Sequence, residues 1–172
     1  GKYTTHRTMA EEIVDFVVKR VNPELKKIKL KKPNTKSPMN PKATIRAIQA
    51  ARVENQKQEL GVDDQLFDRY GAEALSLAEL KKDSMECPDG FPMLAEQLKL
   101  NLKTSMVMHL EDFFLRRTAL FCSRDDQGWP WAKSLARVWA AERGLGEVEI
   151  QSELDRLKIE LDRRSAWKTK MT

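Results

Sequence analysis

The chain has 172 residues, of which 41% are hydrophobic and 33% are charged, a balance typical of a soluble helical protein with a core of its own. Its net charge is +5, but nine basic residues and one acidic residue between Lys19 and Lys42 give that stretch +8, which leaves −3 for the rest. No run of about eighteen apolar residues occurs, so the composition excludes a transmembrane helix.

The cysteines and histidines are scattered. Cys87 and Cys122 lie far from each other and from His6 and His109, which argues against both a zinc site and a disulfide framework, so we predict no metal site. Free thiols suit a reducing compartment, and we expect a cytoplasmic location. Because the chain begins at Gly1 rather than at a methionine, we expect it to be part of a longer polypeptide.

The first predicted element is an amphipathic helix behind a short polar lead-in, within residues 1–20. Ile13, Phe16 and Val17 recur at helical spacing, and basic residues gather at the end where the helix dipole favours them. Pro23, preceded by Asn22, is expected to end this helix.

Residues 23–42 are interpreted as an exposed basic linker, since lysines alternate with Ile28 and Leu30 and prolines follow. The alternative is a weak docking strip for an anionic membrane surface, where each lysine adds about 1 kcal/mol of attraction. The residues of that strip are Lys26, Lys27, Lys29, Lys31 and Lys32. The stretch lacks aromatic residues and is nearly without arginine, so we predict no nucleic-acid partner.

A helix is expected over about 41–60, ended by Gly61. Its apolar side is predicted to consist of Ile45, Ile48 and Ala51. Two short helices, 62–70 and 72–82, are expected on either side of Gly71.

The most apolar stretch is 94–121, which follows a loop over 83–92. Its apolar residues recur at steps of three and four, so we expect one long helix from Leu94 to about Leu115 in the middle of a bundle. The stripe consists of Leu98, Leu102, Met106, Leu110, Phe113 and Phe114, widened by Leu100, Val107, Met108 and Leu115.

Charged residues interrupt this stripe at Asp112, Arg116 and Arg117. We interpret them as structural ion pairs that hold helices in register, because buried charges require partners. The alternative, a charged active site, lacks an adjacent nucleophile or base.

After a second loop, over 123–128, a helix is expected up to Gly144 and a last one over 147–164. The first is lined by Trp129, Trp131, Leu135, Val138 and Trp139, and the last by Ile150, Leu154, Leu157 and Leu161. The chain is therefore predicted to be all-α, a bundle of about six to eight helices.

Two segments resemble FAD-dependent glycerol-3-phosphate dehydrogenases and α-glycerophosphate oxidases. The first is GKYTTHRTMAE at the start, where His6 replaces the usual tyrosine; the second is an Ala-Glu pair followed by LEDFFLRRTAL, with Ser105 where the family usually has a glutamate. The matching positions are Gly1, Lys2, Thr4, Thr5, Arg7, Met9, Ala10, Glu11, Ala95, Glu96, Asp112, Arg116, Arg117 and Thr118.

The resemblance implies a division into the tail of an FAD-binding domain (1–22), the linker (23–42) and a C-terminal helical domain (43–172). It implies that Lys2, Tyr3 and Thr4 lie against the pyrimidine side of the flavin, and that Lys2 contacts the substrate. The resemblance implies FAD in the full-length enzyme. Because the chain itself carries no glycine-rich nucleotide-binding fingerprint, we expect neither bound flavin nor activity in the isolated chain.

Three functions remain open at this point. By resemblance, the complete enzyme oxidises sn-glycerol 3-phosphate to dihydroxyacetone phosphate, passing electrons to quinone from a peripheral position on the inner face of the membrane. The second possibility is an oxidase that reduces oxygen, and the third is a non-enzymatic helical module that binds an acidic partner through its lysines. The expected partner is the upstream FAD-binding domain, with an anionic membrane surface and quinone as further candidates; the oligomeric state is open.

Overall fold

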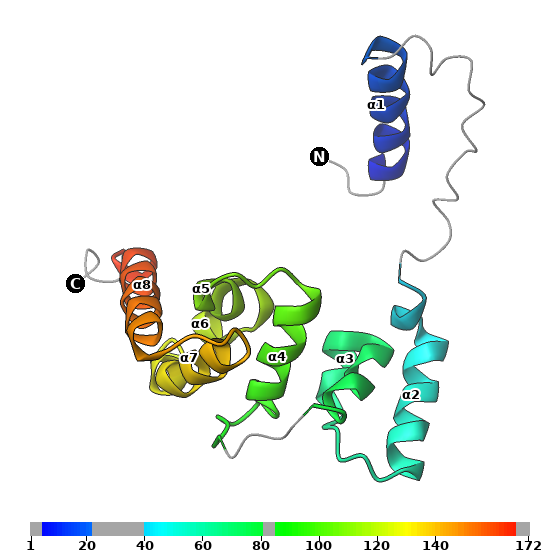
Figure 1. Ribbon diagram of the computed structural model, residues 1–172. Helices are drawn as coiled ribbons and strands as arrows, with labels where there is room; N and C mark the ends of the chain where they lie inside the picture. Colours follow the sequence, from blue (N-terminus) through cyan, green and yellow to red (C-terminus); the bar gives the residue numbers. More distant parts are fainter. Residues whose placement is uncertain (1–4, 22–39, 81–84, 168–172) are drawn as a thin grey trace. The chain divides into compact units, whose positions relative to one another are not determined.

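The computed structural model describes residues 5–21, 40–80 and 85–167. The chain divides into two compact units, Gly1–Pro41 and Lys42–Thr172. All regular structure in the described residues is helical (Figure 1), which confirms the all-α prediction.

The first unit contributes helix α1, His6–Val21, which ends where the Asn-Pro pair predicts. None of its residues is buried. Its large apolar side chains are exposed except for Val18, which is half-buried; the exposed ones are Met9, Ile13, Val14, Phe16, Val17 and Val21.

The second unit opens with helix α2, Ile45–Lys57, and the short helix α3, Gln65–Tyr70. A 3-10 turn, η3 (Pro41–Ala43), precedes α2, and a second, η4 (Gly71–Leu77), follows α3. These elements enclose a small core of Ala51, Val62, Leu66, Phe67, Ala74, Leu77 and Leu100.

The prediction for residues 41–60 was wrong at both ends. The α-helix begins only at Ile45, because the Thr44 side chain accepts the Ala47 N–H and caps the first turn. Ile45 therefore lies at the helix start and is 77% exposed instead of facing the core. The helix ends at Lys57, and the Asn55 side chain holds the following turn by bonding both the N–H and the carbonyl of Val62.

The predicted long central helix is instead interrupted at residues 105–109, and a further short helix lies beyond it. Helix α4 spans Leu94–Thr104, α5 spans Leu110–Asp112, the π-helical turn η5 spans Phe113–Arg117, and α6 spans Leu120–Ser123. Residues 105–109 are not helical.

The break overturns the placement of two methionines on the core stripe. Met106 has a positive φ of 52° and is 84% exposed, and Met108 is 56% exposed. The central position of α4 nevertheless holds: Leu94, Ala95 and Leu98 contribute to the larger core, and Leu100 contributes to the smaller one.

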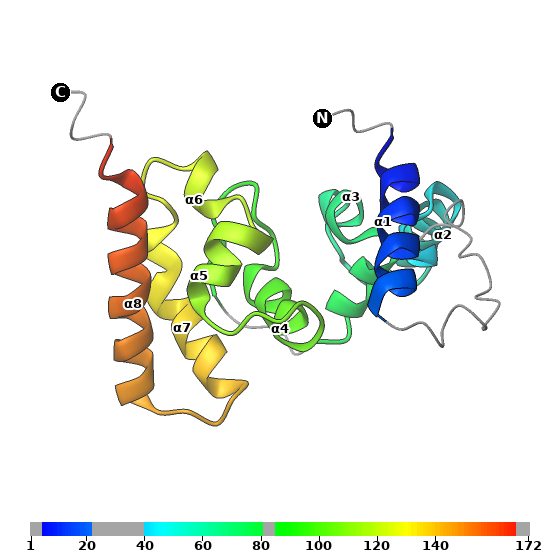
Figure 2. The ribbon, with the colours of Figure 1, turned by 90° about the horizontal axis from the view of Figure 1, so that it is seen from above.

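The last helices agree with the sequence more closely. After a 3-10 turn, η6 (Trp129–Trp131), helix α7 spans Ala132–Ala141, and α8 spans Glu147–Ser165. Figures 1 and 2 show α7 and α8 packed side by side. The four leucine and isoleucine positions predicted for the last helix are all buried.

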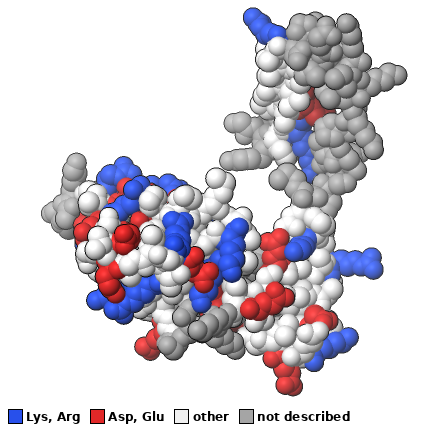
Figure 3. Space-filling model, viewed as in Figure 1, with Lys and Arg blue, Asp and Glu red and all other residues white. Residues whose placement is uncertain are grey.

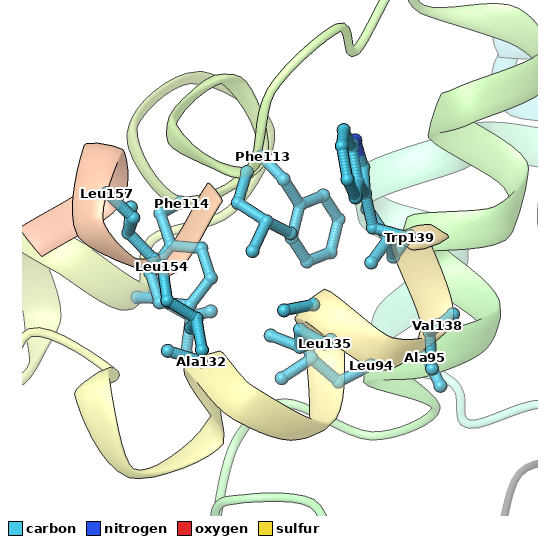
Figure 4. Close-up of a cluster of buried hydrophobic side chains, with 14 of the residues drawn as sticks. Leu94, Ala95, Phe113, Phe114, Ala132, Leu135, Val138, Trp139, Leu154 and Leu157 are labelled. Carbon is cyan, nitrogen blue, oxygen red and sulfur yellow. The ribbon is translucent and has the colours of Figure 1, made fainter. Parts of the chain in front are cut away.

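The larger core lies where α4, α5, η5, α7 and α8 meet. Phe113 and Phe114 are both fully buried, and Figure 4 shows them pointing toward α7, which presents Ala132, Leu135 and Trp139. A π turn rotates less per residue than an α turn, so two adjacent phenylalanines can face the same core.

Candidate functional site

The residues assigned to flavin and substrate by resemblance, Lys2, Tyr3 and Thr4, lie outside the described residues. The same holds for the lysine strip of residues 26–32. Flavin contact and membrane docking therefore stay predictions that rest on the sequence.

Helix α1, which follows directly, has a clear apolar face. Met9, Ile13, Phe16 and Val17 follow one another at steps of four, three and one, which places them on one side of the helix. Each of these side chains is between 46% and 61% exposed. An apolar helix face of this width is typical of an element that packs against a further surface.

Asp112 organises the start of the segment that follows the break. Its Oδ2 accepts the backbone N–H groups of Met108, at 3.0 Å, and His109, at 3.1 Å, while Oδ1 pairs with the Arg116 guanidinium. Burial opposes ionisation of Asp112, but the two backbone donors and Arg116 outweigh it, so the pKa of this carboxyl lies below its ordinary value.

Arg117 turns back toward the end of α4. Its Nη2 donates to the Ser105 carbonyl at 2.9 Å. The side chains of Asp112, Arg116 and Arg117 thus all bond within residues 105–117, and their structural role is a proposal that these contacts support.

Two residues of the α7 region also hold this segment, although the sequence predicts only a core position for Trp139 and no role for Arg143. The Arg143 guanidinium donates to the carbonyls of Val107, at 2.7 Å, and Met108, at 2.8 Å. Trp139 Nε1 donates to the same Met108 carbonyl at 3.2 Å, and Arg143 lies 4.8 Å from the Trp139 ring. These donors satisfy carbonyls that the broken helix leaves without an intrahelical partner.

A third residue missed at the sequence level is Glu153, a carboxylate on α8 that is only 5% exposed. Its Oε1 accepts the Leu110 N–H at 2.6 Å, and its Oε2 lies 3.0 Å from His109 Nδ1. It sits on the buried side of α8 next to Leu154, at the spacing that the apolar residues follow. A glutamate that falls on the apolar stripe of a helix is the sequence signal that could have indicated a buried polar contact.

A second polar network joins α3 to α4. Gln97 is fully buried, and its Oε1 accepts from Arg69 Nη1 and from the Tyr70 hydroxyl, both at 2.9 Å. Asn101 Nδ2 donates to the Tyr70 oxygen at 3.0 Å. Burial raises the pKa of the Tyr70 hydroxyl, against smaller opposing effects of Asn101 and Arg69.

The contacts around residues 105–110 and the network around Gln97 are better suited to a structural role than to catalysis. In both, the polar side chains named above bond one another or backbone groups. Across the described ranges, no group of three or more His, Cys, Asp or Glu is placed to hold a metal ion. Figure 3 shows basic and acidic side chains interspersed over the visible face of the second unit.

The comparisons with known proteins agree with this helical architecture. Residues 39–149, more than half of the chain, match the family described as the C-terminal domain of alpha-glycerophosphate oxidase. Along 94% of its length, the chain is also 26% identical to an aerobic glycerol-3-phosphate dehydrogenase from Staphylococcus saprophyticus. The chain spans 31% of that relative's length. No solved structure matches.

The chain therefore belongs to the family of C-terminal domains of alpha-glycerophosphate oxidase. This confirms the family resemblance seen in the two sequence segments. Among the described residues, none of the helices is long and apolar enough to cross a membrane.

Proposed function

We propose that the chain is the C-terminal part of an FAD-dependent glycerol-3-phosphate dehydrogenase. The observation that carries this proposal is the match to a protein named aerobic glycerol-3-phosphate dehydrogenase along 94% of the chain. Such coverage extends beyond residues 39–149 on both sides, so it includes much of the first unit as well as the helical domain.

The complete enzyme oxidises sn-glycerol 3-phosphate to dihydroxyacetone phosphate, and FAD supplies the hydride acceptor when bound. Lys2 contacts the anionic substrate, and the backbone of Lys2, Tyr3 and Thr4 lies against the flavin. An ammonium group suits a phosphorylated substrate as a mobile point charge. The support for these three roles is the matching sequence; the described structure begins just after them.

In this proposal, residues 1–22 end the FAD-binding domain, 23–42 form the linker, and 43–172 form the helical domain. The exposed apolar face of α1 supports the first part of this division, because a helix with no buried residue of its own needs an external surface. The division of the structure near Pro41 lies close to the proposed end of the linker.

The electron acceptor is proposed to be quinone, reached by an enzyme at the inner face of the membrane. The lysine strip supports this location, because lysines near an anionic leaflet attract it at low salt. Sedimentation of the full-length enzyme with anionic vesicles, with and without Lys26, Lys27, Lys29, Lys31 and Lys32 changed to Gln, tests the docking. Binding that is independent of these lysines would contradict it.

An oxidase is the second candidate, favoured by the description of the matching family. The two are separated by assaying the purified full-length protein with glycerol 3-phosphate and either a soluble quinone analogue or oxygen. Turnover with the quinone analogue and little peroxide formation supports the dehydrogenase. Stoichiometric peroxide formation assigns the oxidase instead, and no turnover with either acceptor overturns both.

A further inference from the structure

The segment 105–109, here called the methionine loop, is irregular yet firmly held. Six hydrogen bonds with side chains fix its backbone. Arg117 donates one and Arg143 donates two to loop carbonyls, Trp139 donates one, and Asp112 accepts two from loop N–H groups. The loop is thus bound to the helical segment that follows it and to the α7 region.

This fixed backbone presents two large apolar side chains to solvent. Met106 is 84% exposed and adopts a positive φ, a backbone conformation that is unfavourable for any residue with a Cβ atom. Val107, between the two methionines, is buried. Methionine is favoured at binding surfaces because its flexible thioether adapts to a partner. The loop therefore offers a preorganised apolar contact.

Basic residues flank the loop in the sequence, and each has a partner: Lys103 Nζ lies 3.9 Å from Glu142, Arg116 pairs with Asp112, and Arg117 donates to the Ser105 carbonyl. Lys103 and Arg116 have side chains that are 59% and 49% exposed, and Arg117 is exposed beside Ser105.

We infer that the methionine loop docks onto the part of the longer polypeptide that lies upstream of this chain. The inference rests on the proposed function, in which the chain is the C-terminal part of a larger enzyme. The length of the similar dehydrogenase indicates which surface the loop contacts: the chain covers 31% of that protein, so most of its length lies outside the match. A rigid loop with two protruding thioethers fits a folded neighbour, which gains contact area without having to order the loop.

The test is methionine oxidation in the full-length polypeptide by dilute hydrogen peroxide, with mass spectrometry of the individual peptides. Oxidation of a thioether to its sulfoxide by peroxide, which releases water, follows solvent exposure. The matched control is V148M, because Val148 on α8 is 80% exposed and so reports the rate of an uncovered thioether. We expect Met106 and Met108 to be oxidised about tenfold more slowly than the thioether introduced at position 148.

Equal oxidation rates at Met106 and at position 148 overturn the inference. Protection that disappears on dilution also overturns it, because a second copy of the chain would then be the occupant. The readout needs neither flavin nor substrate, so it is separate from the fate of the proposed function. If the enzyme is active but its methionines are unprotected, the docking inference is wrong and the proposed function stands. If the polypeptide is inactive but its methionines are protected, the docking inference stands.

Discussion

Glu153 on α8 accepts the backbone N–H of Leu110 at 2.6 Å and thereby fixes the start of α5 from the opposite side of the core. The carboxylate is 5% exposed, and Leu110 is fully buried. A donor in such a place has no access to water, so the Leu110 N–H depends on this carboxylate for an acceptor.

Replacing Glu153 by Ala is expected to lower the free energy of unfolding by about 2–3 kcal/mol, because the Leu110 N–H loses its charged acceptor. Glu153→Gln keeps an acceptor oxygen and should cost less. Urea unfolding provides the measurement, and Asp155→Ala, on the exposed side of the same helix, is the control. If Glu153→Ala and Asp155→Ala unfold at the same urea concentration, the assigned role is wrong.

Gly71→Ala is expected to destabilise the fold more than Gly144→Ala. Both glycines have a positive φ, 61° and 67°, so both variants carry backbone strain, and the ψ of −144° at Gly71 adds to it. A Cβ at position 71 would lie 2.8 Å from the Lys42 carbonyl oxygen, whereas nothing lies within 4 Å at position 144. The excess loss, about 1–3 kcal/mol in thermal or urea unfolding, measures this close approach together with the glycine-specific backbone of position 71. Equal losses would mean that Lys42 moves aside freely.

The stability of the chain should fall in acid partly through Asp112. The folded-state pKa of Asp112 lies below its ordinary value of 3.8, so its contribution is present above that value and is lost as the pH falls through the folded pKa. Asp112→Asn should lower stability at pH 7 and make the curve flatter below about pH 5. Glu160, whose pKa Arg163 and Arg164 lower to about 2, titrates in both proteins, so the difference curve isolates Asp112. A difference curve that is independent of pH would contradict the role given to Asp112.

The sequence predicts the helices whose apolar spacing is sustained and whose ends carry ordinary signals. The last helix is the clearest case: Ile150, Leu154, Leu157 and Leu161 recur at steps of four, three and four, and all four are buried. The first helix likewise ends before its Asn-Pro pair.

The break in the central helix could not be read from periodicity, because Met106 fits the apolar stripe. The loop is held by Arg143 and Glu153, which approach from distant positions in the chain, so tertiary contacts override the local helical preference. One local signal was available: Asp112 follows His109 by three residues, the spacing at which an acidic side chain bonds the N–H groups that start a helix.

The candidate site was less accessible to sequence reasoning than the fold. Family motifs single out Lys2 and the pair Arg116–Arg117, but spacing alone does not say which backbone groups such side chains reach. The Gln97 network depends on Tyr70, which lies 27 positions earlier. Contacts over such separations follow from the packing of α3 against α4 rather than from any local pattern.

Lys2→Ala in the full-length enzyme is expected to raise the Michaelis constant for glycerol 3-phosphate, because the substrate phosphate loses a cationic partner. Lys19→Ala, farther along the same segment and exposed, is the matched control for a changed net charge. Steady-state kinetics with the soluble quinone analogue provide the measurement. A Michaelis constant that Lys2→Ala leaves unchanged would remove this lysine from the substrate site.

In the proposed function, this chain completes a flavoenzyme that oxidises glycerol 3-phosphate. The most direct measurement is the visible absorbance of the purified full-length protein, recorded without oxygen before and after addition of sn-glycerol 3-phosphate. We predict a bound-flavin spectrum that loses its visible absorbance on addition of this substrate and does not change with glycerol alone. A flavin-loaded protein whose spectrum is unaffected by glycerol 3-phosphate would contradict the account.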